Sequence, residues 1–235
     1  PISATPGSPS SSGTSAAAEG RNRTRSATIA AAKNGLGVTG VAPGVRLIDL
    51  RAGTKTGMFF LGPSINAITA AADLDADVAN MSFYIDPWRY ACRGGAPGDE
   101  PDEAAMQEVT IELTQRAITD ARKRGVTLVG SAGNGGGDLS EPGVDDTSPN
   151  YGGTARERTI NPDRCLSLPS DVADVIGVTA VGPDRALAHY SDMSSDPDDD
   201  LVDIAAPGGD GFETTDAVLS TYPLAGLRDE GLVVG

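Results

Sequence analysis

Short apolar runs rich in β-branched residues alternate with helix-forming segments along most of this chain, and this order constrains the fold more than any other feature. The runs expected to form strands are residues 45–50, 78–83, 126–130, 175–181 and 201–205. The segments expected to form helices are residues 28–33, 65–74 and 103–124. Strands that alternate with helices pair in parallel through right-handed crossovers, and parallel strands are apolar throughout because both sheet faces are covered. The sequence therefore predicts an α/β fold, a three-layer sandwich with a mainly parallel central sheet.

The longest expected helix and two loops add detail to this fold. In the 103–124 helix we expect Val109, Leu113, Ala117 and Ala121 to form the buried face. Open parallel sheets carry their functional loops at the carboxyl ends of the strands. Two such loops stand out, residues 82–84 and the glycine-rich residues 131–137.

The first 27 residues differ from everything that follows. They are rich in Ser, Ala, Pro and Gly without periodicity, and Arg21, Arg23 and Arg25 come just before the regular pattern begins at Thr28. Such a composition is typical of a disordered linker. Because the change is abrupt, an out-of-frame translation of this segment is the other interpretation. We expect residues 1–27 to be separate from a domain that spans residues 28–235.

The charge of the chain excludes some partners. It carries 33 acidic and 18 basic residues, for a formal net charge of −15, and nucleic acid is not an expected partner because phosphate binding needs basic groups. No apolar run of membrane-spanning length occurs, so no membrane partner is expected. The acidity favours solubility, with structural calcium at Asp198, Asp199 and Asp200 as the alternative. No other metal or cofactor is expected, since one histidine and two distant cysteines form no ligand cluster.

Three further patterns are weighed for chemistry. Residues 35–40 fit G-x-G-x-x-G, but the motif follows an expected helix and leads to a strand, the reverse of a dinucleotide site. Asn134, in the glycine-rich loop, could donate its carboxamide N–H to a developing oxyanion or be an ordinary turn residue. His189 could be a general base, although a structural histidine is the interpretation we favour. No G-x-S-x-G motif occurs.

Five segments together resemble the subtilisin-like (subtilase, S8) serine protease family. They are residues 28–51 (TIAAAKNGLGVTGVAPGVRLIDLR), 78–83 (VANMSF), 125–134 (GVTLVGSAGN), 172–195 (VADVIGVTAVGPDRALAHYSDMSS) and 202–210 (VDIAAPGGD). Their order and spacing fit the family, and the resemblance covers about residues 28–223.

The resemblance implies roles for particular residues. Asn134 matches the oxyanion-hole asparagine. The substrate-binding residues would be Ser82, Phe83 and Tyr84, which pair with the substrate backbone, and Ser131, Ala132 and Gly133, which form one wall of the primary specificity pocket. Cys92 and Cys165 lie in insertions like those of secreted actinobacterial-type relatives, which favours a disulfide over two free thiols. The family further implies a secreted, monomeric endopeptidase that acts on protein or peptide substrates through an acyl-enzyme.

The chain departs from the family at all three residues of the catalytic triad. The histidine motif H-G-T-H-V-A-G should precede Thr28, where residues 21–27 contain no histidine, and neither the aspartate motif nor G-T-S-M-A-x-P is found. We therefore expect a peptidase domain that is incomplete at both ends and inactive alone. A truncated or frame-shifted protease is favoured because Asn134 and the substrate strand are intact. The alternative is a catalytically dead homologue that serves as a protein-binding module.

Overall fold

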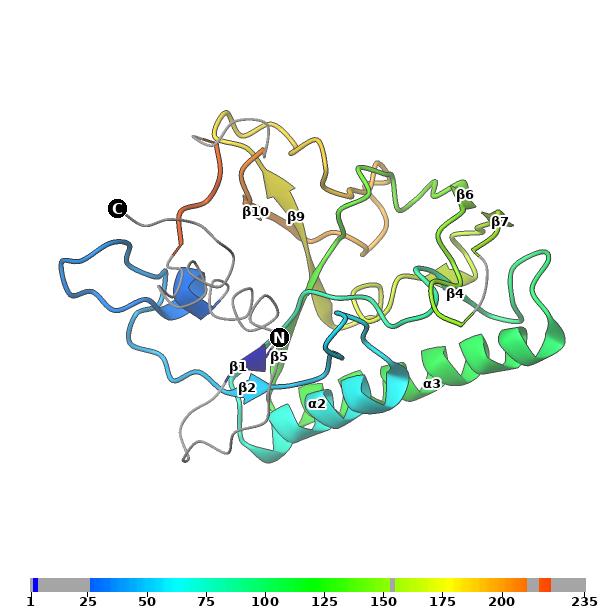
Figure 1. Cartoon of the computed structure of the whole chain (residues 1–235), viewed down its shortest axis with the longest axis horizontal. Helices are drawn as coiled ribbons and strands as arrows, with labels where there is room; N and C mark the ends of the chain where they lie inside the picture. The colour runs from blue at the N-terminus through cyan, green and yellow to red at the C-terminus, as the bar shows by residue number, and fades with distance from the viewer. Residues whose placement is uncertain (1, 4–25, 153–154, 211–215, 221–235) are drawn as a thin grey trace.

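Four parallel strands form the central sheet of the computed structural model, which describes residues 2–3, 26–152, 155–210 and 216–220. The strands are β3 (Val78–Met81), β5 (Thr127–Ser131), β9 (Val175–Val181) and β10 (Ile204–Pro207), in the spatial order β10–β9–β5–β3 (Figure 1). All three neighbouring pairs are parallel. The predicted α/β fold with a mainly parallel central sheet is therefore confirmed.

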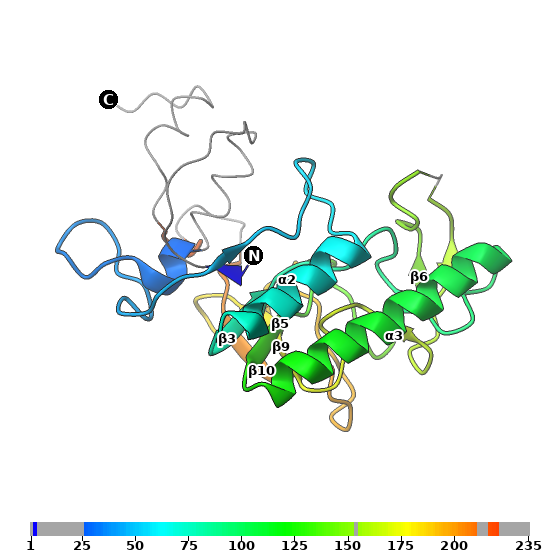
Figure 2. The same ribbon diagram turned by 90° about the horizontal axis from the view of Figure 1, so that it is seen from below.

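Two long helices, α2 (Leu61–Asp73) and α3 (Pro101–Lys123), lie side by side on the same face of this sheet (Figures 1 and 2). Their buried isoleucines Ile68, Ile111 and Ile118 pack with Met81 and Leu128 of the strands in the main core. The described residues place no long helix on the opposite face. A capping box between Glu100 and Glu103 begins α3, and its carboxyl end is followed by a left-handed glycine at position 125 (φ +94°).

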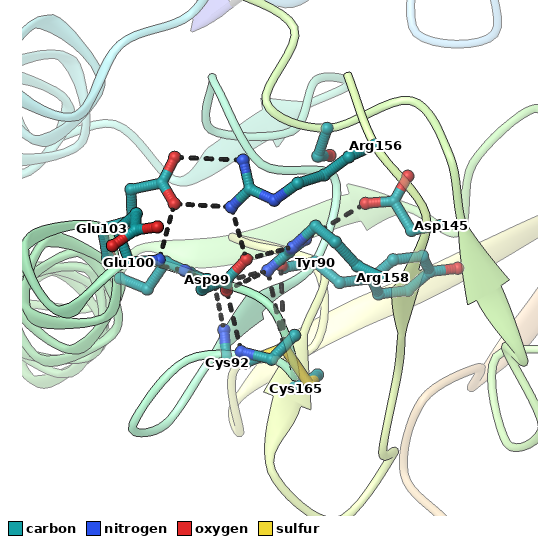
Figure 3. Close-up of polar contacts among 12 residues, drawn as sticks. Tyr90, Cys92, Asp99, Glu100, Glu103, Asp145, Arg156, Arg158 and Cys165 are labelled. Carbon is teal, nitrogen blue, oxygen red and sulfur yellow. Dashed lines mark hydrogen bonds and ion pairs between the residues drawn. A yellow bond between two sulfur atoms is a disulfide. The ribbon is translucent and has the colours of Figure 1, made fainter. Parts of the chain in front are cut away.

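Three small antiparallel sheets surround the central one. β1 (Ile2–Ser3) pairs with β2 (Asp49–Leu50), β4 (Ala91–Cys92) pairs with β8 (Cys165–Leu166), and β6 (Val144–Asp145) pairs with β7 (Arg158–Thr159). Cys92 and Cys165, which face each other in the β4–β8 pair, form a disulfide. The disulfide joins the segment before α3 to the segment before β9, beside a cluster of buried charges centred on Arg158 (Figure 3).

The expected elements match the observed ones unevenly. The run at 175–181 coincides with β9, whereas only Asp49–Leu50 of the 45–50 run forms a strand. Helix α2 begins four residues before the expected 65, because Pro63 lies in its first turn, where the missing N–H costs no hydrogen bond. The helix expected at 28–33 is a single turn over residues 26–30.

The expected buried face of α3 is wrong in its first half. Val109 and Leu113 are exposed, whereas Ala117 and Ala121 are buried. A strict spacing of four residues drifts by about 40° per step on a helix with about 3.6 residues per turn. Three steps carry Val109 away from the core that Ala121 contacts. The residues that α3 buries instead are Gln107, Thr110, Ile111, Thr114, Ala117, Ile118 and Ala121.

Candidate active site

The two loops singled out from the sequence leave neighbouring strands at the same edge of the sheet. In the β3–β5 pair, Met81 is in register with Gly130, so the chain continues into Ser82 on one strand and Ser131 on the other. Both loops lie at the carboxyl ends of parallel strands, where open α/β sheets bind their ligands. The structure therefore brings the two predicted substrate-binding segments together.

The side chains of the 82–84 segment are held by the protein. The Ser82 hydroxyl accepts a hydrogen bond from Asn80 Nδ2 at 3.1 Å, and the Phe83 ring stacks on Phe59 with 4.3 Å between centroids. The Tyr84 hydroxyl accepts from Asn150 Nδ2 at 2.8 Å, and burial, together with the Asp86 carboxylate, raises the pKa of Tyr84 above its ordinary value.

The backbone of the same segment is available to a ligand. Within the described part of the chain, the N–H groups of Phe83 and Tyr84 have no hydrogen-bond acceptor, and Ile85 is the first residue beyond them whose N–H is paired, with Leu168 O at 2.9 Å. An extended peptide can pair with such unsatisfied backbone groups as an added strand. The fixed side chains and open backbone of residues 82–84 are what a substrate-binding strand requires.

The second loop extends β5 and then turns sharply. The Ala132 N–H donates to Val178 O at 2.9 Å, and Ser131 O accepts from the Ser170 hydroxyl at 2.8 Å. Gly133 has φ +133°, a conformation that only glycine adopts readily. Asn134 comes next and is exposed, and its carboxamide has no partner among the described residues. This amide can therefore donate to a bound group without breaking a bond within the protein.

His189 contacts Asp210. Its Nδ1 lies 3.1 Å from Asp210 Oδ1, and its backbone N–H donates to the same oxygen at 3.0 Å. Both hydrogen bonds lower the pKa of Asp210. Both side chains are partly exposed, so this contact contributes little to stability. This geometry assigns the histidine to a contact between the loops that follow β9 and β10.

A comparison with known protein families matches residues 23–228 to the subtilase family. The chain belongs to the subtilase family. Its candidate oxyanion donor and substrate strand, described above, lie within the matched residues. The family assignment supports a serine protease hydrolase, as the five sequence segments predict.

Solved structures show the same fold. A lanthipeptide protease superposes with a TM-score of 0.60 at 20% identity, covering 91% of this chain and 53% of its own. The epidermin leader peptide processing serine protease from Staphylococcus aureus superposes with a TM-score of 0.57 at 24% sequence identity. The match covers 79% of this chain and 39% of the epidermin protease. The nisin leader peptidase NisP from Lactococcus lactis superposes with a TM-score of 0.57 at 20% sequence identity. The match covers 87% of this chain and 50% of NisP. The subtilase chain thus spans about half, or less, of these proteins.

The remaining expectations concern metals, nucleotides and membranes. Among the residues that the structure describes, no three His, Cys, Asp or Glu side chains are grouped to hold a metal ion, and calcium at Asp198, Asp199 and Asp200 stays a prediction. Residues 35–40 follow the 26–30 turn and open no helix, as the sequence order predicts. No helix in the described ranges is long and apolar enough to span a membrane.

The buried carboxyl group of Asp171 lies in a segment with no distinguishing sequence pattern, so the sequence does not predict it. Its Oδ2 accepts the Ser167 N–H at 2.6 Å, and its Oδ1 is buried with no partner among the described residues. Burial, together with the nearby carboxylates of Asp199 and Asp192, raises the pKa of Asp171 from 3.8 to about 7.

We expect Asp171→Asn to stabilise the protein at pH 8 and not at pH 4. The folded state holds the Asp171 proton more tightly than the unfolded chain, so stability falls as pH rises from about 4 to 7. The uncharged asparagine amide removes this penalty. We expect the free energy of unfolding to rise by about 1–3 kcal/mol at pH 8, a range that allows for the cost of leaving part of the buried amide without a hydrogen bond. Urea unfolding at both pH values measures the difference in free energy of unfolding between the variant and the parent. The matched control is Asp163→Asn, at an exposed position. Equal effects at the two pH values would contradict the prediction.

Proposed function

We propose that this chain is the oxyanion-donating and substrate-binding part of a subtilisin-like serine endopeptidase, which cleaves protein or peptide substrates through an acyl-enzyme. The observation that carries the proposal is the unpartnered Asn134 carboxamide at the same carboxyl edge of the sheet as the unpaired N–H groups of Phe83 and Tyr84. A substrate strand bound along Phe83 and Tyr84 places its carbonyl groups at the carboxyl edge of the sheet. A donor fixed there stabilises the negative charge that develops on the carbonyl oxygen in the tetrahedral intermediate.

The chemistry of the complete protease requires three groups besides this donor. A serine attacks the scissile carbonyl, a histidine removes the serine proton and returns it to the leaving amine, and an aspartate orients the histidine. The family positions for these residues are not filled in this sequence, and its one histidine is His189. We propose that residues 1–235 bind substrate without cleaving it.

The disulfide supports a location outside the cytoplasm. Structural disulfides persist in oxidising compartments and are rare in the cytosol, and Cys92 and Cys165 are both buried in the disulfide-bonded form. We propose that the protein is secreted, as the family implies, and that it acts as a monomer.

Two measurements on the purified chain test the proposal. We expect no hydrolysis of a fluorogenic casein and no labelling by a fluorophosphonate, and turnover abolished by that reagent would overturn the predicted inactivity. We expect an extended peptide library, titrated into ¹⁵N-labelled protein, to shift the Phe83, Tyr84 and Asn134 amide resonances. Shifts confined to other residues would contradict the assigned site. If the flanking gene sequence encodes no triad, peptide binding would instead support the binding-module alternative.

A further inference from the structure

We propose that the ion pair between the partly exposed Arg89 and the buried Asp192 positions the oxyanion loop, defined as residues 133–137. The proposal rests on the oxyanion role proposed for Asn134, which lies within this loop. Asp192 lies in the family-resembling segment 172–195, whereas Arg89 lies in none of the five segments, and the two residues are 103 positions apart in the sequence. Both act through the loop backbone and are positioning residues.

Asp192 binds the loop at both of its ends. The backbone N–H of Asp192 donates to Gly133 O at 3.1 Å, and its Oδ1 accepts the Gly137 N–H at 2.8 Å. Asn134 lies between these two attachment points. The Asp192 side chain is only 2% exposed, and its Oδ2 accepts a hydrogen bond from Arg89 Nη2 at 2.8 Å. One buried carboxylate therefore links the guanidinium to the end of the loop.

The ion pair packs closely against the glycines of the loop. A Cβ atom at Gly133 would lie 2.1 Å from Asp192 Oδ2, and a Cβ atom at Gly135 would lie 2.2 Å from Arg89 Nη2. Real Cβ atoms do not approach other heavy atoms so closely, since packed interiors leave no such overlap. The carboxylate and the guanidinium therefore lie directly against the residues on either side of Asn134.

The pair is itself anchored to the central sheet. Asp192 O accepts the Thr179 hydroxyl of β9 at 2.8 Å, and Gly136 N–H donates to Tyr190 O at 2.8 Å. A buried carboxylate requires a compensating partner, and the Arg89 side chain supplies it with a permanent positive charge.

Amide hydrogen exchange of the 235-residue chain tests whether the ion pair positions the oxyanion loop. We expect Arg89→Gln and Asp192→Asn to raise the exchange rate of the Gly136 and Gly137 amides by about tenfold or more, because the Asp192 carboxylate that accepts the Gly137 N–H is removed or loses its partner Arg89. Exchange in β5 and β9 should remain unchanged. The control is Arg93→Gln, which breaks an exposed ion pair with Glu108 outside the loop and should leave loop exchange unaltered.

The variants separate local positioning from general stability. Arg89→Lys keeps the charge and should restore most of the loop protection, which also covers the case in which Asp192→Asn does not fold. Unchanged loop exchange in Arg89→Gln would overturn the proposal, as would an equal rise across β5 and β9. Peptide titration of the parent chain is a separate readout. If the parent binds no peptide, the proposed function fails even where the exchange results stand.

Discussion

Replacing Arg158 with methionine is expected to lower the free energy of unfolding by about 3–5 kcal/mol, because the change removes one partner from a buried charge cluster. The Arg158 side chain is fully buried and donates to both carboxylate oxygens of Asp99, at 2.9 and 3.0 Å, and to Asp145 Oδ2 at 3.2 Å (Figure 3). Both carboxylates are 1% exposed. Arg156 also contacts Asp99, at 2.7 Å in the parent chain, so we expect Asp145 to be the group that the substitution leaves without a cation.

The loss of stability caused by Arg158→Met should depend on pH. Burial opposes ionisation of Asp99, but the hydrogen bonds from Arg158 and Gln107 outweigh it and hold the pKa of Asp99 well below its ordinary value. In the parent chain this stabilisation is present above about pH 4 and is lost as pH falls. Without Arg158, the buried acids take up protons more readily, so the deficit of the variant should be smaller at pH 5 than at pH 8.

Urea unfolding of Arg158→Met at these two pH values measures the effect. The matched control is Arg116→Met on α3, whose ion pair with Glu112 is exposed and should contribute at most about 0.5 kcal/mol. A loss no larger than that of the control would show that the cluster adds nothing to stability.

Replacing Asn134 with leucine is expected to lower kcat by about 10²–10³-fold in a protein that carries this domain together with the triad, with little change in KM. The magnitude was measured on subtilisin itself and is not calculated for this chain. The donor acts on charge that exists only in the transition state and its neighbouring intermediate, so its loss reduces kcat and leaves ground-state binding nearly unchanged.

Steady-state hydrolysis of a peptide substrate measures this loss. Asn66→Leu, an exposed position on α2, is the matched control and should retain the parent kcat. A rise in KM with unchanged kcat would instead assign Asn134 to substrate binding and remove the oxyanion donor from the proposed mechanism.

Hydrophobic pattern and family resemblance together predicted the parts of this domain that depend on local sequence. β9 is apolar on both faces and occupies the expected residues 175–181. The order of strands and helices predicts that residues 82–84 and 131–137 follow the carboxyl ends of parallel strands, and the register of β3 with β5 confirms it. The glycine content of residues 131–137 predicts unusual backbone there, and Gly133 has φ +133°; the oxyanion role of Asn134 stays a prediction.

The rest could not be predicted because it depends on contacts between distant segments. The 45–50 run is mostly irregular, since tertiary context overrides strand propensity. The polar side of α3 is buried because Gln107 binds the backbone of Cys92 and the guanidinium of Arg158. With 33 acidic residues in the chain, no sequence signal selects Asp192 as the partner of Arg89, or Asp99 as the partner of Arg158.

The disulfide has a consequence for a protein exposed to proteases. Cys92 and Cys165 are 73 residues apart, and the covalent ring that they close contains α3, β5 and the oxyanion loop. A single backbone cut within this ring, for example beside the exposed Tyr151, leaves two polypeptides joined through sulfur. Exposed loops are the preferred sites of such nicks. A nicked molecule would therefore migrate as one species on a non-reducing gel, and the fragment that carries β9 and Asp192 would stay joined to the fragment that carries Asn134.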